Sequence, residues 1–252
     1  PKTPRLLADP ALAEDVQQRL NAKDSPMRIS IELAQQGIRI SHETIYQSIY
    51  NTRGLTKGTH RHLHLQRRRR RPRNHNTAAG SNSLGVYCSI HDRPQSAADR
   101  SEFGHLEGDL IVGAYNKSAL ITIFDRASRF LWLEQPASKS APAVQAALEH
   151  LLLHRIPNAL TLTWDQGAEI ARHREIALTC GIEIYIADPK SPWQRPTNEN
   201  GNAIIRRYAP KGTDLNALAR ADLDHIEQRI NTIPRRTHNW ATAQDIYHQL
   251  TR

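Results

Sequence analysis

The chain has 252 residues, of which 38% are hydrophobic and 23% are charged, enough for a packed core within one large or two ordinary domains. The net charge of +9 favours a polyanionic partner, such as nucleic acid or an acidic membrane surface. No run of about 18 apolar residues occurs and no signal-peptide pattern opens the sequence, so we expect no membrane span. Cys88 and Cys180 form no CxxC pair, which favours a reducing cytoplasm.

Residues 1–58 have the periodicity of short helices. Apolar side chains recur at Leu12, Val16 and Leu20, the spacing of one helix face. Ser25 and Gly37 then bracket a second helical pattern as N-cap and C-terminal glycine. The pattern predicts a small all-α domain.

A third helix is expected over residues 42–51, after a short turn and with Ser41 as its N-cap. It should bury Ile45 and Ile49, and its outward-facing side chains should be His42, Glu43, Gln47 and Ser48. Helix, tight turn, helix is the layout of a helix-turn-helix, in which His42, Glu43 and Gln47 would read DNA. An ordinary three-helix bundle is the alternative.

Residues 59–85 are predicted to be a basic linker. The sequence there contains five consecutive arginines: Arg67, Arg68, Arg69, Arg70 and Arg71. Charges this dense repel one another and resist burial, so we expect an extended segment that binds DNA phosphates. A solvated spacer is the alternative. The following "NTAAGSNSLG" has linker composition and marks a domain boundary.

From residue 86 the periodicity changes to that of an α/β domain. Three short apolar runs predict three antiparallel strands, followed by a helix, a strand, a helix, a strand and a helix, ending near residue 212. This order describes a ribonuclease-H-like core with a five-stranded mixed sheet and helices. Residues 213–252 contain two further helical patterns, predicted to be a C-terminal extension of the core.

Three carboxylates fall at ends or edges of these elements. Asp109 lies inside the first strand, Asp165 ends the fourth, and Glu199 opens the last helix of the core with Thr197 as its predicted N-cap. The first and fourth strands are neighbours in this topology, so we expect the acids to converge. Two Mg²⁺ ions about 4 Å apart require such hard oxygen ligands. Capping or solvated acids are the alternative.

Other side chains surround these positions. Glu107 points to the same side of its strand as Asp109 and is either an outer partner or a rim acid. Glu169 is expected either to orient a metal ligand or to be an acid at the start of a helix, stabilised by the helix dipole. Asn198 and Asn202 are further candidates for contacts to the metal-binding acids. Trp193 either packs in the core or stacks on a base. The basic residues expected to contact DNA here are Lys190, Arg195, Arg206 and Arg207.

Four motifs carry a resemblance to a known family: "ISHETIYQSIY", "GHLEGDLIVG", "TLTWDQGAE" and "ADPKSPWQRPTNENGNAIIRRYAPKGTDL". They resemble the bacterial DDE transposases of the insertion sequence 30 family. By matching position, the resemblance assigns the catalytic and metal-binding acids to Asp109, Asp165 and Glu199. The chain departs from the family pattern at Leu106, Ile170, Thr197 and Gly201.

The resemblance implies Mg²⁺ as cofactor, two ions with Mn²⁺ as a substitute. It implies cleavage at the terminal inverted repeats of a mobile element and transfer of the 3′-hydroxyl into target DNA. The active form would be a homo-oligomer, a dimer or larger. It would lie in the bacterial cytoplasm, associated with the nucleoid and not with a membrane. The competing hypotheses are a ribonuclease-H-like nuclease that cuts without joining, and a non-catalytic DNA-binding regulator.

Overall fold

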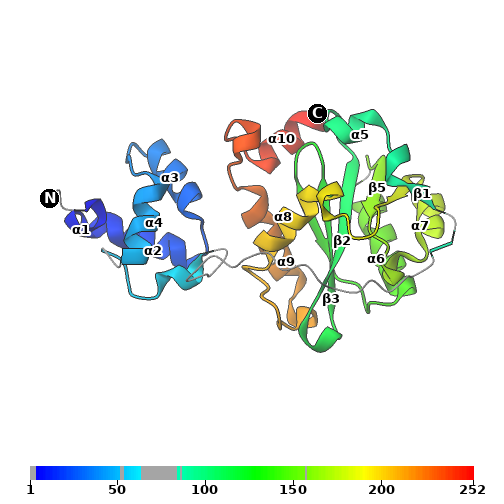
Figure 1. Cartoon of the computed structure of the whole chain (residues 1–252), viewed down its shortest axis with the longest axis horizontal. Coiled ribbons are helices and arrows are strands. Elements are labelled where there is room, and N and C mark those ends of the chain that lie inside the picture. The colour runs from blue at the N-terminus through cyan, green and yellow to red at the C-terminus, as the bar shows by residue number, and fades with distance from the viewer. Residues whose placement is uncertain (1–3, 52–53, 64–83, 86, 157) are drawn as a thin grey trace. The chain divides into compact units, whose positions relative to one another are not determined.

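The computed structural model describes residues 4–51, 54–63, 84–85, 87–156 and 158–252. Residues 1–76 form one compact unit and residues 77–252 form the other (Figure 1). The predicted arginine tether, residues 67–71, lies outside the described residues, and the finer domain boundaries remain predictions. No helix in the described ranges is long and apolar enough to cross a membrane.

The first unit is helical, as predicted. Its elements are α1 (Arg5–Ala8), α2 (Pro10–Asn21), α3 (Pro26–Gln35), α4 (His42–Asn51) and a 3₁₀ turn, η1 (Thr59–His62). Side-chain oxygens of Ser25 and Ser41 accept the backbone N–H groups of Arg28 and Thr44, which confirms both predicted caps. Gly37 has a φ of 82° just past α3, where a left-handed residue ends a helix.

The core of this unit is built from the predicted apolar faces. Val16, Leu20 and Ile45 are fully buried, together with Ile29 and Leu33 of α3. The prediction for Ser48 was wrong, because its side chain is buried rather than outward-facing. Ser48 lies three residues after Ile45 and next to Ile49, so it belongs to the packed side of α4.

The second unit has a six-stranded sheet in the order β1-β6-β5-β2-β3-β4. The strands are β1 (Cys88–Ser89), β2 (His105–Val112), β3 (Ala119–Asp125), β4 (Leu131–Glu134), β5 (Thr161–Trp164) and β6 (Glu183–Ile186). β3 is antiparallel to β2 and β4, and the pairs β2–β5, β5–β6 and β6–β1 are parallel. This is a ribonuclease-H-like sheet, with one more strand than predicted, because two-residue β1 is too short to show a period.

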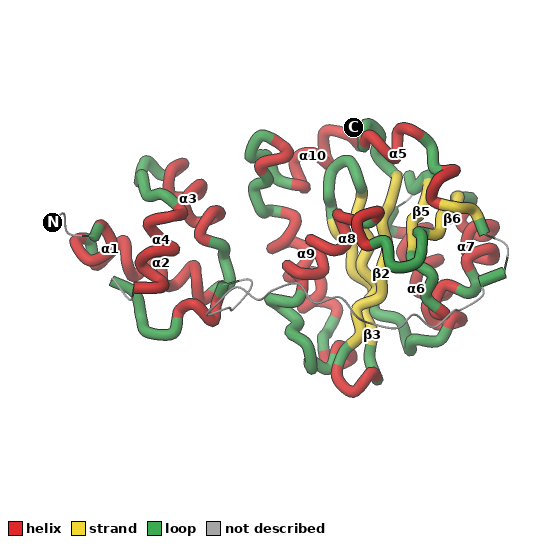
Figure 2. Tube along the Cα trace, in the orientation of Figure 1, coloured by secondary structure: helices red, strands yellow, loops and turns green. Residues whose placement is uncertain are grey.

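Helices cover both faces of this sheet. They are α5 (Gln95–Asp99), α6 (Ala141–His154), α7 (His173–Cys180), α8 (Pro196–Ile205), α9 (Arg220–Asn231) and α10 (Ala243–Leu250). Alternation along β2 sends Leu106 to the side of α6 and α7 and Ile111 to the side of α8 and α9. Glu107 and Asp109 share the side of Ile111, so both lie beneath α8, which crosses β2 and β3 (Figure 2).

Helix α8 begins two residues before the predicted position. Pro196 is its first residue, and Thr197 lies buried in its first turn instead of capping it. Proline favours the first helical position because its φ is already fixed and its missing N–H is not needed there. Gly201 then lets α8 approach β3, since a Cβ at this position would lie 2.0 Å from Cζ of Phe124.

The predicted C-terminal helices are confirmed as α9 and α10, and α9 covers the edge strand β4. Glu227 Oε1 accepts the N–H of Leu133 at 2.7 Å, and Asn231 exchanges two hydrogen bonds with the backbone of Leu131. The backbone groups of Leu131 and Leu133 on the edge strand β4 are thereby hydrogen-bonded to side chains of α9.

Candidate active site

Asp109 and Asp165 lie together because β2 and β5 are parallel neighbours. Arg195 joins them: its Nη2 lies 2.9 Å from Oδ2 of Asp165 and its Nη1 lies 3.6 Å from Oδ1 of Asp109. Nη1 also donates to the carbonyl oxygen of Gly108 at 2.9 Å. The sequence placed Arg195 among the DNA contacts, whereas here its guanidinium is the counter-ion of the two carboxylates.

Asp109 is held from the side of α8. The side-chain amide of Asn202 donates to Oδ2 of Asp109 at 2.5 Å, and Asn202 Oδ1 accepts the hydroxyl of Thr122 at 3.0 Å. Burial raises the pKa of Asp109, Arg195 opposes this shift, and the charge of Asp165 adds to it. The site therefore favours a cation beside this carboxylate.

One carboxylate oxygen of Asp165 is unpaired within the described chain. Its Oδ1 is buried and has no hydrogen-bond partner among the described residues. Buried polar atoms in proteins are nearly always paired, so an orphaned carboxylate oxygen beside a second carboxylate fits a hard divalent cation. Mg²⁺ is commonly held by one or two carboxylates, with waters or phosphates completing its shell.

Glu199 is not brought into this pair. Its side chain is exposed on α8, one turn before Asn202. In the described part of the chain, no three Asp, Glu, His or Cys side chains are grouped closely enough to hold a metal together. Its role as third metal ligand stays a prediction.

Glu169 lies near enough to the two aspartates for their charges to act on it. It lies in the first turn of a 3₁₀ helix, η4 (Ala168–Ile170), before α7 begins at His173, so both alternatives for this acid stay predictions. Burial raises the pKa of Glu169, and the charges of Asp165 and Asp109 raise it further. Gly167 makes room for this carboxylate, since a Cβ there would lie 2.0 Å from it.

Glu107 is fully buried, so the alternative of a rim acid was wrong. Its Oε1 is paired with Arg126, and its Oε2 accepts the backbone N–H of Asn198 at 3.0 Å. This N–H belongs to the first turn of α8, where backbone donors have no partner within the helix. Glu107 therefore ties the start of α8 to β2.

The hydroxyl of Thr122 was not singled out from the sequence. It lies within hydrogen-bonding distance of both Asn198 and Asn202, at 3.3 and 3.0 Å. Arg126 was also missed: it lies in the turn after β3, and local spacing does not show that it pairs with Glu107 of β2.

A cleft of ≈ 350 Å³ opens beside Asp165 and is lined by Lys190 and Arg195, among others. Lys190 is exposed, and Trp193 is 69% exposed, so the alternative of a core tryptophan was wrong. Arg206 donates to the carbonyl oxygen of Val112 at 2.8 Å, and Arg207 is half-buried. Lys190 is therefore accessible at the cleft, and Trp193 is exposed in the adjoining 3₁₀ turn η5 (Pro192–Gln194).

The three residues predicted to contact DNA bases in the first unit lie together on α4. Glu43 and Gln47 are exposed one turn apart, with Gln47 Nε2 3.4 Å from Glu43 Oε1, and His42 is half-buried at the start of the helix. All three lie in the first two turns, where a recognition helix presents side chains to base edges.

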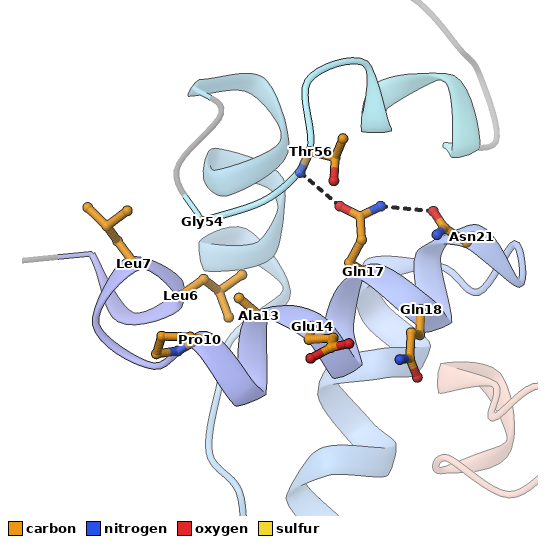
Figure 3. Close-up of a pocket in the computed structure, with 10 residues that line it drawn as sticks. All are labelled: Leu6, Leu7, Pro10, Ala13, Glu14, Gln17, Gln18, Asn21, Gly54 and Thr56. Carbon is orange, nitrogen blue, oxygen red and sulfur yellow. Dashed lines mark hydrogen bonds between the residues drawn. The ribbon is translucent and has the colours of Figure 1, made fainter.

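A cavity of ≈ 570 Å³ lies in the same unit, between α2 and the segment around Thr56. Figure 3 shows Gln17 pointing from α2 to Thr56 and Asn21, with hydrogen bonds of 3.0 and 2.8 Å. Gly54 passes so close to Leu6 that a Cβ would lie 2.3 Å from its carbonyl oxygen. Among the described residues of this lining, Glu14 is the one acid, so they include no paired carboxylates like those on the sheet.

A ribonuclease-H-like sheet with Asp109 on β2 and Asp165 directly after the neighbouring β5 is the layout of polynucleotidyl transferases of the integrase type. Residues 99–192 match the integrase core domain family. The chain is 39% identical, over 98% of its length, to the transposase for insertion sequence element IS1086 of Cupriavidus metallidurans, and covers 75% of that protein.

Two further relatives are transposases. The transposase for element IS30A of Escherichia coli is 35% identical over 92% of this chain, which spans 63% of that protein. The transposase for element IS4351 of Bacteroides fragilis is 33% identical over 96% of this chain and is covered over 74% of its length. The chain belongs to the insertion sequence 30 family of transposases, and the resemblance inferred from its motifs is confirmed.

Proposed function

We propose that this transposase cleaves DNA at the ends of its insertion sequence and joins the resulting 3′-hydroxyl to target DNA, with Asp109, Asp165 and Glu199 as the acids of the site. The observation that carries the proposal is the pairing of Asp109 with Asp165, whose buried Oδ1 has no partner in the described chain. Both steps are phosphoryl transfers, which need positioned charge rather than a covalent nucleophile on the protein.

Asp109 and Asp165 would hold Mg²⁺. When bound, two such ions lower the pKa of the attacking hydroxyl or water and stabilise the leaving oxygen. Asn202 keeps the Asp109 carboxylate in place, and Glu107 anchors the helix that carries Asn202. Glu199 is proposed as the third ligand because it lies on α8 three residues, a rise of about 4.5 Å, before Asn202.

The DNA contacts follow from exposure. Lys190 would meet a phosphate at the cleft, and Trp193 would stack on a base unpaired near the cut. In the first unit, α4 would read the terminal inverted repeat. Because two element ends must be joined, we propose a dimer or larger assembly as the active form.

The test is incubation of the chain with linear terminal-repeat DNA and Mg²⁺, scoring cleavage and joining separately. Asp109→Asn, Asp165→Asn and Glu199→Gln should each abolish both reactions and leave DNA binding intact. Asp224→Asn, an exposed acid on α9, is the matched control and should remain active.

Each result decides between the hypotheses. Cleavage without joining would favour the nuclease, and DNA binding with neither reaction would favour the regulator. Full activity of Glu199→Gln would remove that residue from the site, and Glu169→Gln would then be the next variant to test, because Glu169 lies near both aspartates.

A further inference from the structure

Three arginines and a histidine gather where β2 begins: Arg100, Arg129, Arg235 and His238. Arg100 follows α5, Arg129 lies in the turn between β3 and β4, and the other two lie between α9 and α10. Two hydrogen bonds join these segments: His238 Nε2 donates to the carbonyl oxygen of Ser128 at 3.1 Å, and Arg126 Nε donates to that of Ala97 at 2.6 Å.

Arg235 is the least satisfied member of this cluster. Its Nε and Nη2 are buried and have no acceptor among the described residues. Its backbone is held on both sides, because its N–H donates to Ala241 and its carbonyl oxygen accepts from Trp240, each at 3.0 Å. Leaving these two buried donors without acceptors costs free energy.

The other arginines supply no compensation. Within the described ranges, no carboxylate forms an ion pair with Arg100, Arg129 or Arg235. Glu107 lies near enough to act on Arg129, but it is already paired with Arg126. Burial, together with the charge of Arg129, lowers the pKa of Arg235 to about 10.

We propose that Arg129, Arg235 and their neighbours form a binding site for a backbone phosphodiester of duplex DNA, separate from the carboxylate site. Guanidinium groups bind phosphate through two parallel N–H donors and stay charged under all physiological conditions. Arg100, Arg129 and Arg235 are each partly exposed, and none is ion-paired with a carboxylate in the part of the chain that the structure describes. The inference rests on DNA as the substrate of the proposed function.

The position along the sheet suits a duplex that also reaches the acids. Arg126 donates its backbone N–H to the carbonyl oxygen of His105, at the first residue of β2. Asp109 lies four residues further along that strand, about 13 Å at 3.3 Å per residue. That length corresponds to about four base-pair steps of 3.4 Å, so the site would hold DNA beside the cleaved bond.

The experiment measures duplex binding over a range of KCl concentrations with the full chain. Arg235→Gln and Arg129→Asn are tested singly and together, since Asn tolerates the left-handed backbone of Arg129, whose φ is 61°. Arg172→Gln is the control, because it removes the same charge from an exposed side chain that bonds Gln145. We expect the double variant to lower the slope of log K against log salt by about one to two units and the control to leave it unchanged.

The outcomes distinguish a phosphate of the DNA backbone from free inorganic phosphate as the bound anion. Melting temperatures of the wild type in inorganic phosphate and in chloride of equal ionic strength show whether a free anion binds. A large phosphate effect with unchanged DNA slopes would overturn the proposal, as would slopes unchanged in both single variants. All salt slopes are also measured with Asp109→Asn present. DNA binding is then measured without cleavage, so this test does not depend on whether the proposed reaction is correct. A melting temperature of Arg235→Gln at or above that of the wild type shows that a lower slope is not due to unfolding.

Discussion

The backbone N–H of Asn198 donates to Oε2 of Glu107 at 3.0 Å, from the first turn of α8 to the middle of β2. The other oxygen of the same carboxylate is paired with Arg126, and both side chains are buried. Glu107 thus holds the start of α8, the helix that carries Glu199, and also neutralises the charge of the buried Arg126. We infer that Glu107 is a positioning residue, because it touches none of the reacting groups.

Replacing Glu107 should therefore affect stability and the site together. Glu107→Ala leaves the charge of Arg126 buried and unpaired, and we expect a loss of about 3–5 kcal/mol in the free energy of unfolding. Urea unfolding measures this loss. Glu107→Met combined with Arg126→Met removes both charges and should recover most of the stability while cleavage stays impaired. Full cleavage by that folded double variant would show that Glu107 has only a structural role.

Arg195 should compete with a divalent cation for the two aspartates. A hydrogen bond to a charged group is worth about 1.5–3 kcal/mol, so Arg195→Gln should tighten Mn²⁺ binding by about ten- to hundredfold. Without metal the variant should be less stable than the wild type, because the carboxylates lose their counter-ion. Calorimetric titration and melting temperatures with and without Mg²⁺ measure both effects. Equal Mn²⁺ affinity in Arg195→Gln and in the control Arg172→Gln would contradict the competition.

Trp193 should bind unpaired bases near the cut. Stacking contributes about 1–3 kcal/mol per base, so Trp193→Ala should weaken binding to a frayed terminal-repeat end by about five- to 150-fold and change binding to fully paired DNA little. Fluorescence anisotropy with both DNAs measures the difference. Tyr115→Ala, which removes another exposed aromatic ring at 92% exposure, is the control. The hypothesis fails if both variants behave alike.

Helix α4 should distinguish the terminal repeat from random DNA through Gln47. A bidentate contact to adenine gives about 1–3 kcal/mol of discrimination, so Gln47→Ala should weaken binding to the repeat and hardly affect random DNA. Gln18→Ala, an exposed glutamine of α2, is the control. Ile45→Ala removes fully buried packing, should cost about 2–5 kcal/mol of stability, and should lower binding to both DNAs. Equal losses on both DNAs for Gln47→Ala would show that α4 does not read sequence.

His238 should make the stability of the second unit depend on pH. Its pKa is lowered from 6.5, first by burial and then by the charges of Arg129, Arg235 and Arg100. The unfolded chain therefore binds a proton more readily than the folded one, so stability is complete above pH 6.5 and is lost as the pH falls through the folded pKa. His238→Gln keeps a donor for Ser128 and should flatten the fall in melting temperature between about pH 7 and 5. An identical fall in both proteins would assign it to other groups.

Much of the fold was accessible from the sequence because it depends on local spacing. The caps at Ser25 and Ser41, the three antiparallel strands and the helices after residue 212 all follow from periodicity and capping within a few residues. The pairing of Asp109 with Asp165 also followed, since the order of elements determines which strands are neighbours. By contrast, the short strand β1 and the start of α8 depend on tertiary contacts and on a proline, and the periodicity gave no sign of either.

What only the tertiary structure decided is the partner of each charged side chain. The sequence by itself placed Glu107 two residues before Asp109, Glu169 four residues after Asp165 and Arg195 four residues before Glu199. It did not determine that Glu107 is buried against Arg126, that Glu169 folds back over Gly167, or that Arg195 bridges two aspartates. The physical reason is distance along the chain: 86 residues separate Arg195 from Asp109, and only packing of α8 on the sheet brings their charges together. The same holds for Arg235, whose burial beside Arg129 appears only where the α9–α10 segment meets the turn after β3.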